Sequence, residues 1–254
     1  MIHIKNEKEI QLMREAGEIV KKIFVAMEKE VKPGVTTLEL DTMVAKIIKE
    51  NKAKPSFIGV PCMFPEGKSY KHCTCMSVND AIIHGIPNNT PLKEGDVLCL
   101  DVTIEKNGYC ADAGRTYAVG KVSKTAEKLI KVAEEAFFYA MDYAKAGNRI
   151  GDISNAIQTY VEKNGFGLLR DFQGHGIGKE MHEDPGVPNI GRKGTGMRLV
   201  KGMGLAIEPM ITEGNPDVEV LSDLWTIVTK DGKLGAYYEN TIIITENSPD
   251  ILTF

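Results

Sequence analysis

The sequence predicts an α/β (α+β) fold made of two similar halves that share one sheet. The first observation is a faint internal repeat at an offset of 113 residues, and the second is that each half has two helical segments followed by strand-rich sequence. The third is the length of 254 residues, which suits one large domain or two small ones and can bury a substantial core. We expect a single domain over 1–254, with halves at roughly 7–119 and 120–254.

The repeat lies in the helical segments. Lys32-Pro33-Gly34 follows the first helical segment of one half and is echoed by Lys145-Ala146-Gly147 in the other. After each glycine, the spacing of apolar residues predicts a second amphipathic helix, over 38–51 and over 151–164. Chance similarity between helical patterns is the alternative explanation.

Asp101 and Asp112 lie on two predicted strands that are joined by Asn107-Gly108, a strong signal for a type I′ turn. With a two-residue loop, Thr103 faces Asp112 and Asp101 faces Gly114. The two aspartates are then diagonal neighbours on one face, about 7–8 Å apart, so their carboxylates can converge on a metal pair. A solvated hairpin residue is the alternative for each. That alternative is weaker for Asp101, because it follows four apolar residues where an unpaired charge is unfavourable.

Two glutamates also interrupt apolar, β-rich sequence. Glu208 ends the apolar run 203–207, and Glu239 precedes the run 241–244. A carboxylate in such a run is paired, protonated or bound to an ion. A buried salt bridge is the alternative for each glutamate taken alone. For four such acids together, coordination of an ion is the simpler explanation.

His175 lies in the segment Gly-His-Gly-Ile-Gly, whose glycines allow the backbone to approach an ion or substrate closely. His182 flanks the same segment, and His84 precedes a Gly-Ile-Pro turn, so both are candidates for the same cleft. The spacing excludes the HExxH helix of a zinc protease. An ordinary surface or hydrogen-bonded histidine is the alternative, and we assign that role to His3 and His72.

The candidate ligands form an oxygen-rich set: Asp101, Asp112, His175, Glu208 and Glu239. Four carboxylates and one imidazole suit divalent manganese, iron or cobalt better than a structural zinc site. The negative charges of this set would balance two divalent ions. A pair of ions can lower the pKa of a water molecule and polarise a carbonyl, which is the chemistry of peptide-bond hydrolysis.

Composition excludes several classes of protein. The net charge of −4 comes from interspersed acidic and basic residues without a broad basic stripe, which argues against specific nucleic-acid binding. The chain has no apolar run long enough for a transmembrane helix, and its start lacks the apolar core of a signal peptide. Five cysteines in a chain of this size indicate a reducing cytoplasm. GxSxG, P-loop and GxGxxG motifs are absent.

Over essentially its whole length, the chain resembles the type I methionine aminopeptidases. The motifs that carry the resemblance occur in order and with compatible spacings: IIHGIP, LDVT followed by ADAGRT, GHGIG followed by HEDP, IEPM and YYENTIIIT. The resemblance implies the pita-bread fold, in which two pseudo-twofold halves pack helices on a curved, largely antiparallel sheet. It also implies a dimetal hydrolase that removes the initiator methionine from nascent polypeptides when the second residue is small.

The resemblance implies a role for each matching ligand. Asp112 and Glu239 would bridge the two metal ions. His175 and Glu208 would complete the shell of one ion, and Asp101 would complete the shell of the other. The ions would be two divalent cations, with cobalt, manganese, iron and zinc all compatible with the ligands.

Catalytic and substrate-binding roles follow from the same resemblance. Glu208 would be the general base, and His84 and His182 would contact the substrate and its scissile carbonyl. The methionine pocket would be lined by Cys75, Trp225, Met181 and Tyr70. The partners implied are N-termini of nascent polypeptides, with the ribosome as a candidate place of encounter, and the chain would act as a monomer.

The chain departs from the family in a few places. Gln173 replaces a small residue, and Tyr237 and Asn240 flank Glu239 where the family more often has Gln and His. The segment 58–70 is longer than its usual counterpart. We expect none of these departures to touch a metal ligand, so they bear on substrate preference and leave the reaction intact.

Two other functions share part of this pattern. A proline-specific pita-bread peptidase, such as an aminopeptidase P or a prolidase, would use the same ligand set. Those enzymes usually carry an extra amino-terminal domain, whereas the catalytic fold here is expected to start near residue 7. A non-catalytic pita-bread module that binds a partner would typically lose ligands, and all five are present.

Overall fold

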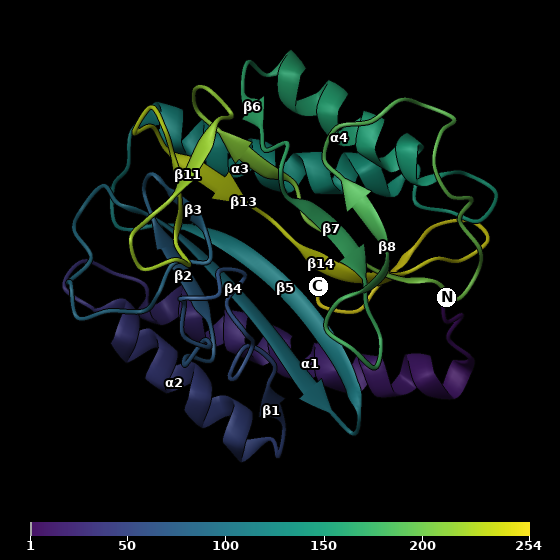
Figure 1. Cartoon of the computed structure of the whole chain (residues 1–254), viewed down its shortest axis with the longest axis horizontal. Helices are drawn as coiled ribbons and strands as arrows, with labels where there is room; N and C mark the ends of the chain where they lie inside the picture. The colour runs from purple at the N-terminus through teal and green to yellow at the C-terminus, as the bar shows by residue number, and fades with distance from the viewer. Residues whose placement is uncertain (1) are drawn as a thin grey trace.

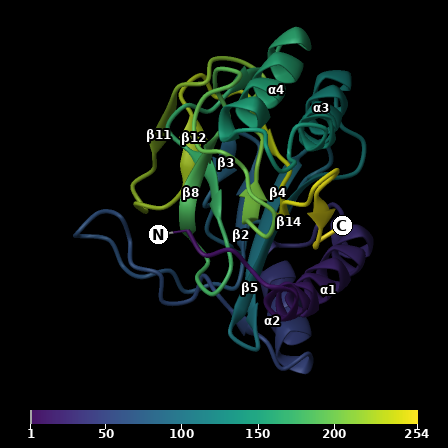
Figure 2. The same ribbon diagram turned by 90° about the vertical axis from the view of Figure 1, so that its right-hand side faces the viewer.

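Helices and strands form separate layers in the computed structural model, which describes residues 2–254. In the side view of Figure 2, the four helices lie toward one side and strands β8, β11 and β12 lie toward the other. Figure 1 shows that α1 and α2 run along one end of this layer and α3 and α4 along the other. Within the described residues, every helix is too short or too polar to cross a bilayer.

The helices come in two consecutive pairs. Their bounds are α1 (Glu7–Glu30), α2 (Thr37–Glu50), α3 (Lys124–Met141) and α4 (Ile150–Lys163). Helix α1 begins with a capping box, because the Asn6 side chain accepts from the Glu9 backbone N–H and the Glu9 carboxylate accepts from the Asn6 N–H. Each helix turns one apolar face toward the strands.

The first half contributes five strands: β1 (Lys54–Pro55), β2 (Cys75–Val78), β3 (Ala81–Ile83), β4 (Val97–Lys106) and β5 (Tyr109–Ala118). The long β4–β5 hairpin dominates this half in Figure 1. Its turn has φ values of 54° at Asn107 and 81° at Gly108, as a type I′ turn requires. Thr103 faces Asp112, and Asp101 faces Gly114. The predicted hairpin and its register are confirmed.

The second half contributes ten strands, all shorter than β4 and β5: β6 (Gly167–Leu168), β7 (Gln173–Gly176), β8 (Glu183–Pro188), β9 (Gly204–Ile207), β10 (Met210–Thr212), β11 (Val218–Val220), β12 (Ile227–Thr229), β13 (Gly235–Tyr237), β14 (Asn240–Ile243) and β15 (Asp250–Ile251). The largest sheet has the order β15-β14-β9-β7-β8, and every pairing between these strands is antiparallel. Strand β12 pairs with β3 of the first half, so the halves share a sheet.

The internal repeat corresponds to the same local structure in both halves. Helix α4 begins and ends 113 residues after α2. Gly34 and Gly147 both have φ of 94°, which favours glycine. Gly34 donates its backbone N–H to Leu92, and Gly147 donates its own to Leu199. The repeat is therefore a structural duplication, while the domain division near residue 119 stays a prediction.

Each pair of helices has its own apolar core. Side chains of α1 and α2 pack on β4 and β5, and those of α3 and α4 pack on second-half strands such as β9 and β14. Ile23 and Phe137 are fully buried in the two cores. Burial of a side chain of this size contributes about 1.5–3 kcal/mol, so the helices fix the strands firmly from one side. The helices leave the opposite face of the strands uncovered.

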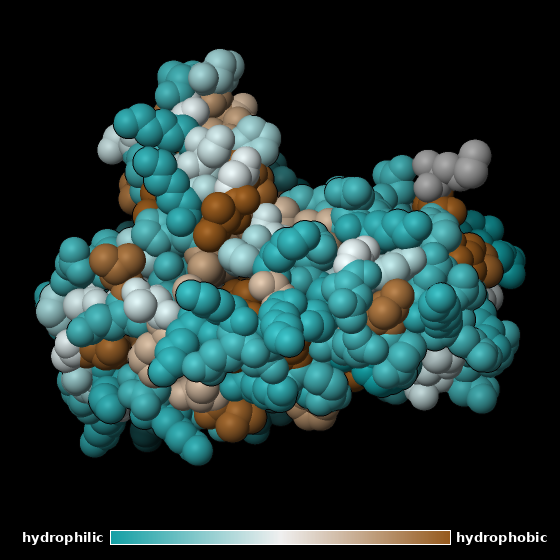
Figure 3. Space-filling model, turned by 90° about the horizontal axis from the view of Figure 1, so that it is seen from below, coloured by the Kyte–Doolittle hydropathy of each residue, from teal (hydrophilic) through white to brown (hydrophobic). Residues whose placement is uncertain are grey.

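The segment 58–70 connects β1 to β2 and projects from the body as the blue loop of Figure 2. It exposes Ile58 and Met63, which are 51% and 64% accessible. By contrast, the face seen in Figure 3, on the side of α1 and α2, is mainly hydrophilic. Apolar side chains that project into solvent in this way can contact a bound ligand or partner.

Candidate active site

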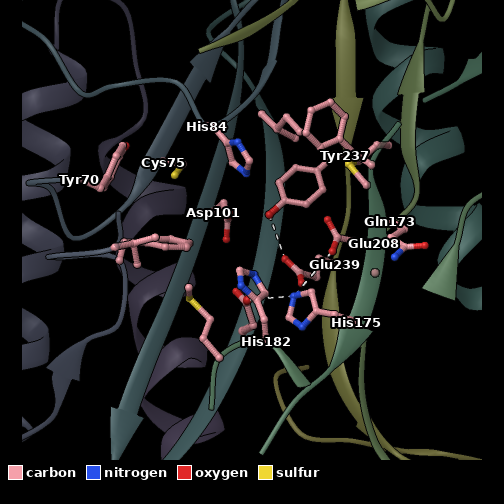
Figure 4. A pocket seen from close by; sticks show the side chains of 18 of the residues that line it. Tyr70, Cys75, His84, Asp101, Gln173, His175, His182, Glu208, Tyr237 and Glu239 are labelled. Carbon is pink, nitrogen blue, oxygen red and sulfur yellow. Dashed lines mark hydrogen bonds and ion pairs between the residues drawn. The ribbon is translucent and has the colours of Figure 1, made fainter. Parts of the chain in front are cut away.

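A cavity of about 320 Å³ lies on the strand face that the helices leave uncovered. All of the site residues predicted from the sequence line this one cavity: Tyr70, Cys75, His84, Asp101, Asp112, His175, Met181, His182, Glu208, Trp225 and Glu239. They come from both halves of the chain, and Figure 4 shows the labelled members pointing into the same space. The duplicated fold thus brings distant stretches of sequence together.

The predicted ligands converge at the back of the cavity. One ligand atom each of Asp112, His175 and Glu239 lies within 4.8 Å of the other two. His175 Nε2 is 3.7 Å from Asp112 Oδ2 and 3.8 Å from Glu208 Oε1. Asp101 lines the same cavity, as Figure 4 shows. These side chains can surround a small cation.

Regular structure positions each carboxylate. Asp101 is on β4 and Asp112 is on β5, two residues apart in the register of the hairpin and therefore on the same face. Glu208 directly follows β9 and precedes Pro209, which cannot continue the hydrogen-bond ladder. Glu239 lies between β13 and β14. Two of the carboxylates are therefore on paired strands, and the other two are in two-residue links between strands, so the backbone holds all four close together.

Burial and mutual repulsion set the protonation of these acids. Burial raises the pKa of the Asp101 carboxyl well above its usual range, and the charges of Asp112 and Glu208 raise it further. Burial likewise raises the pKa of Glu208 and Glu239, with the neighbouring carboxylates adding to the effect. In the described chain, no lysine or arginine lines the cavity to offset this charge. The site therefore has a strong deficit of positive charge.

Two carboxylate oxygens in the cavity also lack a partner. Asp101 Oδ1 and Asp112 Oδ1 are buried and accept no hydrogen bond from residues 2–254. Buried acceptors of this kind are unfavourable unless something binds them. Hard oxygen donors, uncompensated negative charge and free lone pairs are what divalent cations require. The residues present fit a divalent metal site.

The histidine of the ligand set is held in one tautomer. His175 Nδ1 lies 2.9 Å from the Gly176 carbonyl oxygen and donates its proton to it. This leaves Nε2, the nitrogen near Asp112 and Glu208, with a free lone pair for a metal ion. Burial lowers the pKa of His175, which favours the neutral form that can coordinate.

Two further histidines face the ligand set. His182 packs edge to face on His175, with ring centroids 4.4 Å apart, and it is exposed at the cavity mouth. His84 packs on Phe172 at 5.9 Å and has a φ of 57°, a left-handed conformation that is uncommon outside glycine. Burial and the proximity of His182 lower the pKa of His84 to about 4. His84 is therefore neutral at pH 7 and offers one N–H donor.

An apolar wall lies beside the carboxylates. Phe57, Tyr70 and Cys75 form a buried cluster against which Met181 and Trp225 pack. The Tyr70 and Trp225 rings meet edge to face at 4.9 Å. Sulfur and aromatic groups of this kind suit a long, polarizable side chain such as methionine.

The segment 58–70 forms part of this wall. The Trp225 indole N–H donates to the Lys68 carbonyl over 2.9 Å, and Cys62 Sγ contacts the Leu224 carbonyl at 3.3 Å. Sequence reasoning missed further lining residues, which this segment, other loops and strands β3 and β10 supply: Phe57, Val60, Pro61, Met63, Ile83, Phe172 and Met210. None of these residues belongs to a motif. Their one signal in the sequence is that they lie near Tyr70, His84, Gln173 or Glu208.

The departures from the family pattern have different outcomes. The expectation that none touches a metal-ligand candidate is wrong for Tyr237, whose hydroxyl donates to Glu239 Oε2 over 2.9 Å. Tyr237 and Glu239 are two residues apart, and strand alternation places residues at this spacing on the same face. Asn240 points the other way and accepts from Arg115. Gln173 lines the cavity and is exposed.

The histidines assigned ordinary roles have them. His3 contacts Glu9 at the exposed start of the chain, at 2.8 Å. His72 Nδ1 lies 3.3 Å from the buried carboxylate of Asp41, away from the cavity. Neither side chain lines the candidate site.

Comparison with known proteins gives a consistent result. The sequence profile of metallopeptidase family M24 matches residues 11–246. A methionine aminopeptidase of Clostridium perfringens is 49% identical over 253 residues, which cover 100% of this chain and 99% of the relative. The crystal structure of methionine aminopeptidase from Thermotoga maritima has a TM-score of 0.95 at 43% identity, covering 100% of this chain and 99% of that chain.

A more distant match shares the fold alone. The prolidase of Pyrococcus furiosus has a TM-score of 0.76 at 24% identity, and the match covers 99% of this chain but 65% of the prolidase. These likenesses confirm the pita-bread fold. The chain therefore belongs to metallopeptidase family M24 and, within that family, to the methionine aminopeptidases.

Proposed function

We propose that this protein is a methionyl aminopeptidase that removes the amino-terminal methionine from polypeptides whose second residue is small. The observation that carries the proposal is the single cavity in which the predicted metal ligands adjoin a wall of sulfur and aromatic side chains. The first group suits hydrolysis of a peptide bond, and the second suits a methionine side chain. Close relatives bear the same activity in their names.

The metal site would be dinuclear. Asp112 and Glu239 would bridge two divalent ions, His175 and Glu208 would complete the shell of one, and Asp101 that of the other. The proximity of Asp112, His175 and Glu239 and the unpartnered oxygens of Asp101 and Asp112 support this assignment. When bound, such ions lower the pKa of a water molecule and polarise a carbonyl. Cobalt, manganese, iron and zinc all accept these ligands.

The remaining groups would act on the substrate and on protons. Glu208 would accept the proton of the attacking water and pass it to the leaving amine. His84 and His182 would donate N–H groups to the substrate carbonyl, and the neutral state of His84 at pH 7 suits a donor that adds no charge. Cys75, Trp225, Met181 and Tyr70 would enclose the methionine side chain.

The setting would be the cytoplasm, where the enzyme would meet nascent chains near the ribosome and act as a monomer. All five cysteines are unpaired thiols, which suits a reducing compartment. The place of encounter and the monomeric state follow from the resemblance to the family.

The test compares kcat/KM for Met-Ala-Ser, Met-Ile-Ser, Leu-Ala-Ser and Ala-Pro-Ser peptides in the wild type and in Trp225→Ala. The proposal expects the wild type to cleave Met-Ala-Ser far faster than the other three. It expects Trp225→Ala to lose most of the preference for methionine over leucine, because the indole wall is removed. Equal cleavage of Met-Ala-Ser and Leu-Ala-Ser by the wild type would refute methionine specificity. Preferred cleavage of Ala-Pro-Ser would favour the proline-specific alternative.

A further inference from the structure

Tyr237 occupies a place in the cavity that the proposed reaction does not use. The side chain is 2% exposed and lines the cavity beside the candidate ligands. Its hydroxyl donates to Glu239 Oε2 over 2.9 Å, the dashed line from the ring in Figure 4. The phenol thus contacts one of the candidate ligands directly.

The position of this phenol is fixed from both sides. Its ring lies over Gly114, where an added Cβ would be 2.2 Å from Tyr237 Cζ, so glycine at 114 is required for the ring to lie there. The Tyr237 N–H donates to Thr116 Oγ1 over 2.9 Å, and the Thr116 hydroxyl donates to the Tyr237 carbonyl over 2.7 Å. The backbone of β13 is therefore held against β5, and the hydroxyl has little freedom to point elsewhere.

The hydrogen bond has a directional consequence for Glu239. A carboxylate can rotate about its last bond and present different lone pairs to a cation. The phenol holds Oε2, and a carboxylate oxygen of Glu239 lies within 4.8 Å of ligand atoms of Asp112 and His175. The hydrogen bond therefore limits how the carboxylate can turn relative to those two residues. A hydrogen-bond donor behind a ligating group commonly raises metal affinity in this way.

We propose that Tyr237 is a positioning residue, which orients the Glu239 carboxylate for divalent-ion binding through its phenol O–H. The inference rests on one part of the proposed function, the role of Glu239 as a metal ligand, and is independent of which peptide is cleaved. The competing role for Tyr237 is purely structural, namely to fill the space above Gly114 with its ring. The two roles differ in the hydroxyl alone.

The experiment uses Tyr237→Phe, which keeps the ring and removes the hydroxyl. The matched control is Tyr117→Phe, because the Tyr117 hydroxyl is buried without a hydrogen-bond partner in the part of the chain that the structure describes, and it lies outside the cavity. Manganese binding to the metal-stripped full chain is measured by titration calorimetry. The unfolding midpoint of each metal-free protein is measured alongside.

The positioning role predicts manganese affinity about 10–100-fold weaker in Tyr237→Phe than in the wild type, with the metal-free unfolding midpoint retained. Tyr117→Phe should bind manganese as the wild type does. Unchanged affinity in Tyr237→Phe would overturn the inference, and so would an equal loss in Tyr117→Phe. A loss that scales with a lower unfolding midpoint would assign Tyr237 to packing and overturn it as well.

Failure of this inference is distinguishable from failure of the proposed function. A wild type that binds manganese tightly but leaves methionyl peptides intact would refute the proposed activity and leave the role of Tyr237 open to the same titration. A wild type that cleaves methionyl peptides, together with a Tyr237→Phe variant of full manganese affinity, would refute the positioning role alone.

Discussion

Asp41 and Asp112 are both buried aspartates, yet the protein surrounds them in opposite ways. Asp41, on α2, is 7% exposed, and its Oδ1 accepts from the Cys73 N–H at 2.9 Å and from the Thr74 N–H at 2.9 Å and hydroxyl at 2.7 Å. Asp112 is 4% exposed, and its Oδ1 accepts nothing from residues 2–254. The chain has donors for one carboxylate and none for an equally buried oxygen of the other.

The difference separates a structural carboxylate from a functional one. The donors around Asp41 attach α2 to the start of β2. They satisfy the buried carboxylate with hydrogen bonds, and these bonds stabilise the fold. Around Asp112 the neighbours are three further carboxylates. Their mutual repulsion destabilises the metal-free fold, and a bound cation would offset it. A site that is unfavourable by itself becomes favourable when an ion binds, as is usual where stability and activity compete.

The largest effect is expected for Glu208→Gln, because the change removes a proton acceptor from the cavity while keeping the shape of the side chain. We expect kcat for Met-Ala-Ser to fall by about 10²–10⁴-fold in the metal-loaded variant, with a much smaller change in KM. Steady-state kinetics of the wild type and the variant, each with measured metal content, provide the check. An unchanged kcat at full metal content would remove Glu208 from the mechanism.

The next prediction sets the two kinds of carboxylate against each other in metal-free protein. Asp41→Asn should lower the free energy of unfolding by about 1–3 kcal/mol, because an uncharged amide oxygen accepts more weakly than a carboxylate and the amide NH2 replaces Oδ2, which lies 3.3 Å from His72 Nδ1. Asp101→Asn should raise it, because the change relieves repulsion in the cavity.

Urea unfolding of the chelator-treated variants measures both effects. The matched pair differs only in position, since each variant replaces a buried carboxylate with the same amide. Destabilisation of similar size at both positions would contradict the distinction between the two sites.

A smaller effect is expected in the pH dependence of metal-free stability. For Asp101, Glu208 and Glu239 the folded-state pKa is raised, so the folded state binds more protons than the unfolded state above about pH 4. Stability should therefore fall as the pH rises from about 4 toward neutrality. Glu9 has the opposite sign, because its backbone and side-chain hydrogen bonds to Asn6 and Tyr109 lower its pKa to about 2. Its contribution is present above about pH 4 and is lost as the pH falls toward 2.

The measurement is thermal unfolding of chelator-treated protein between pH 3 and 8. Saturating manganese should abolish the decline toward neutrality, since the cation removes the repulsion. Glu9→Gln should leave that decline in place, lower stability by a constant amount above about pH 4 and remove the loss that Glu9 causes on the acid side. A metal-free protein whose stability rises steadily from pH 4 to pH 8 would contradict the raised pKa values of the cavity.

The sequence predicted those features whose signals are local. Asn107-Gly108 determined the hairpin register, so the placement of Asp101 diagonally to Asp112 followed from counting residues. The internal repeat predicted the second helix of each half at matching positions, because helix starts and glycine turns have local sequence requirements. The carboxylates in apolar runs indicated a buried acidic site for the same reason.

The features that the sequence did not reveal depend on contacts between distant segments. The bond from Trp225 to Lys68 joins residues 157 positions apart. The Tyr237 phenol reaches its place only because Gly114, on another strand, leaves room for the ring. The donors around Asp41 also come from a distant loop, so no local pattern distinguishes that aspartate from Asp112.

The most direct test is whether the cavity binds divalent cations. It compares the metal content of the wild type and of Asp112→Ala at a single defined manganese activity. Each protein is stripped with chelator, dialysed against the same buffered manganese and analysed by inductively coupled plasma mass spectrometry, with Asp41→Asn as the control. We expect two manganese ions per chain in the wild type and in Asp41→Asn, and most of this metal lost in Asp112→Ala, because Asp112 would bridge both ions. A wild type that binds no manganese, or an Asp112→Ala variant that retains the full amount, would contradict the assignment of these carboxylates to a two-metal site.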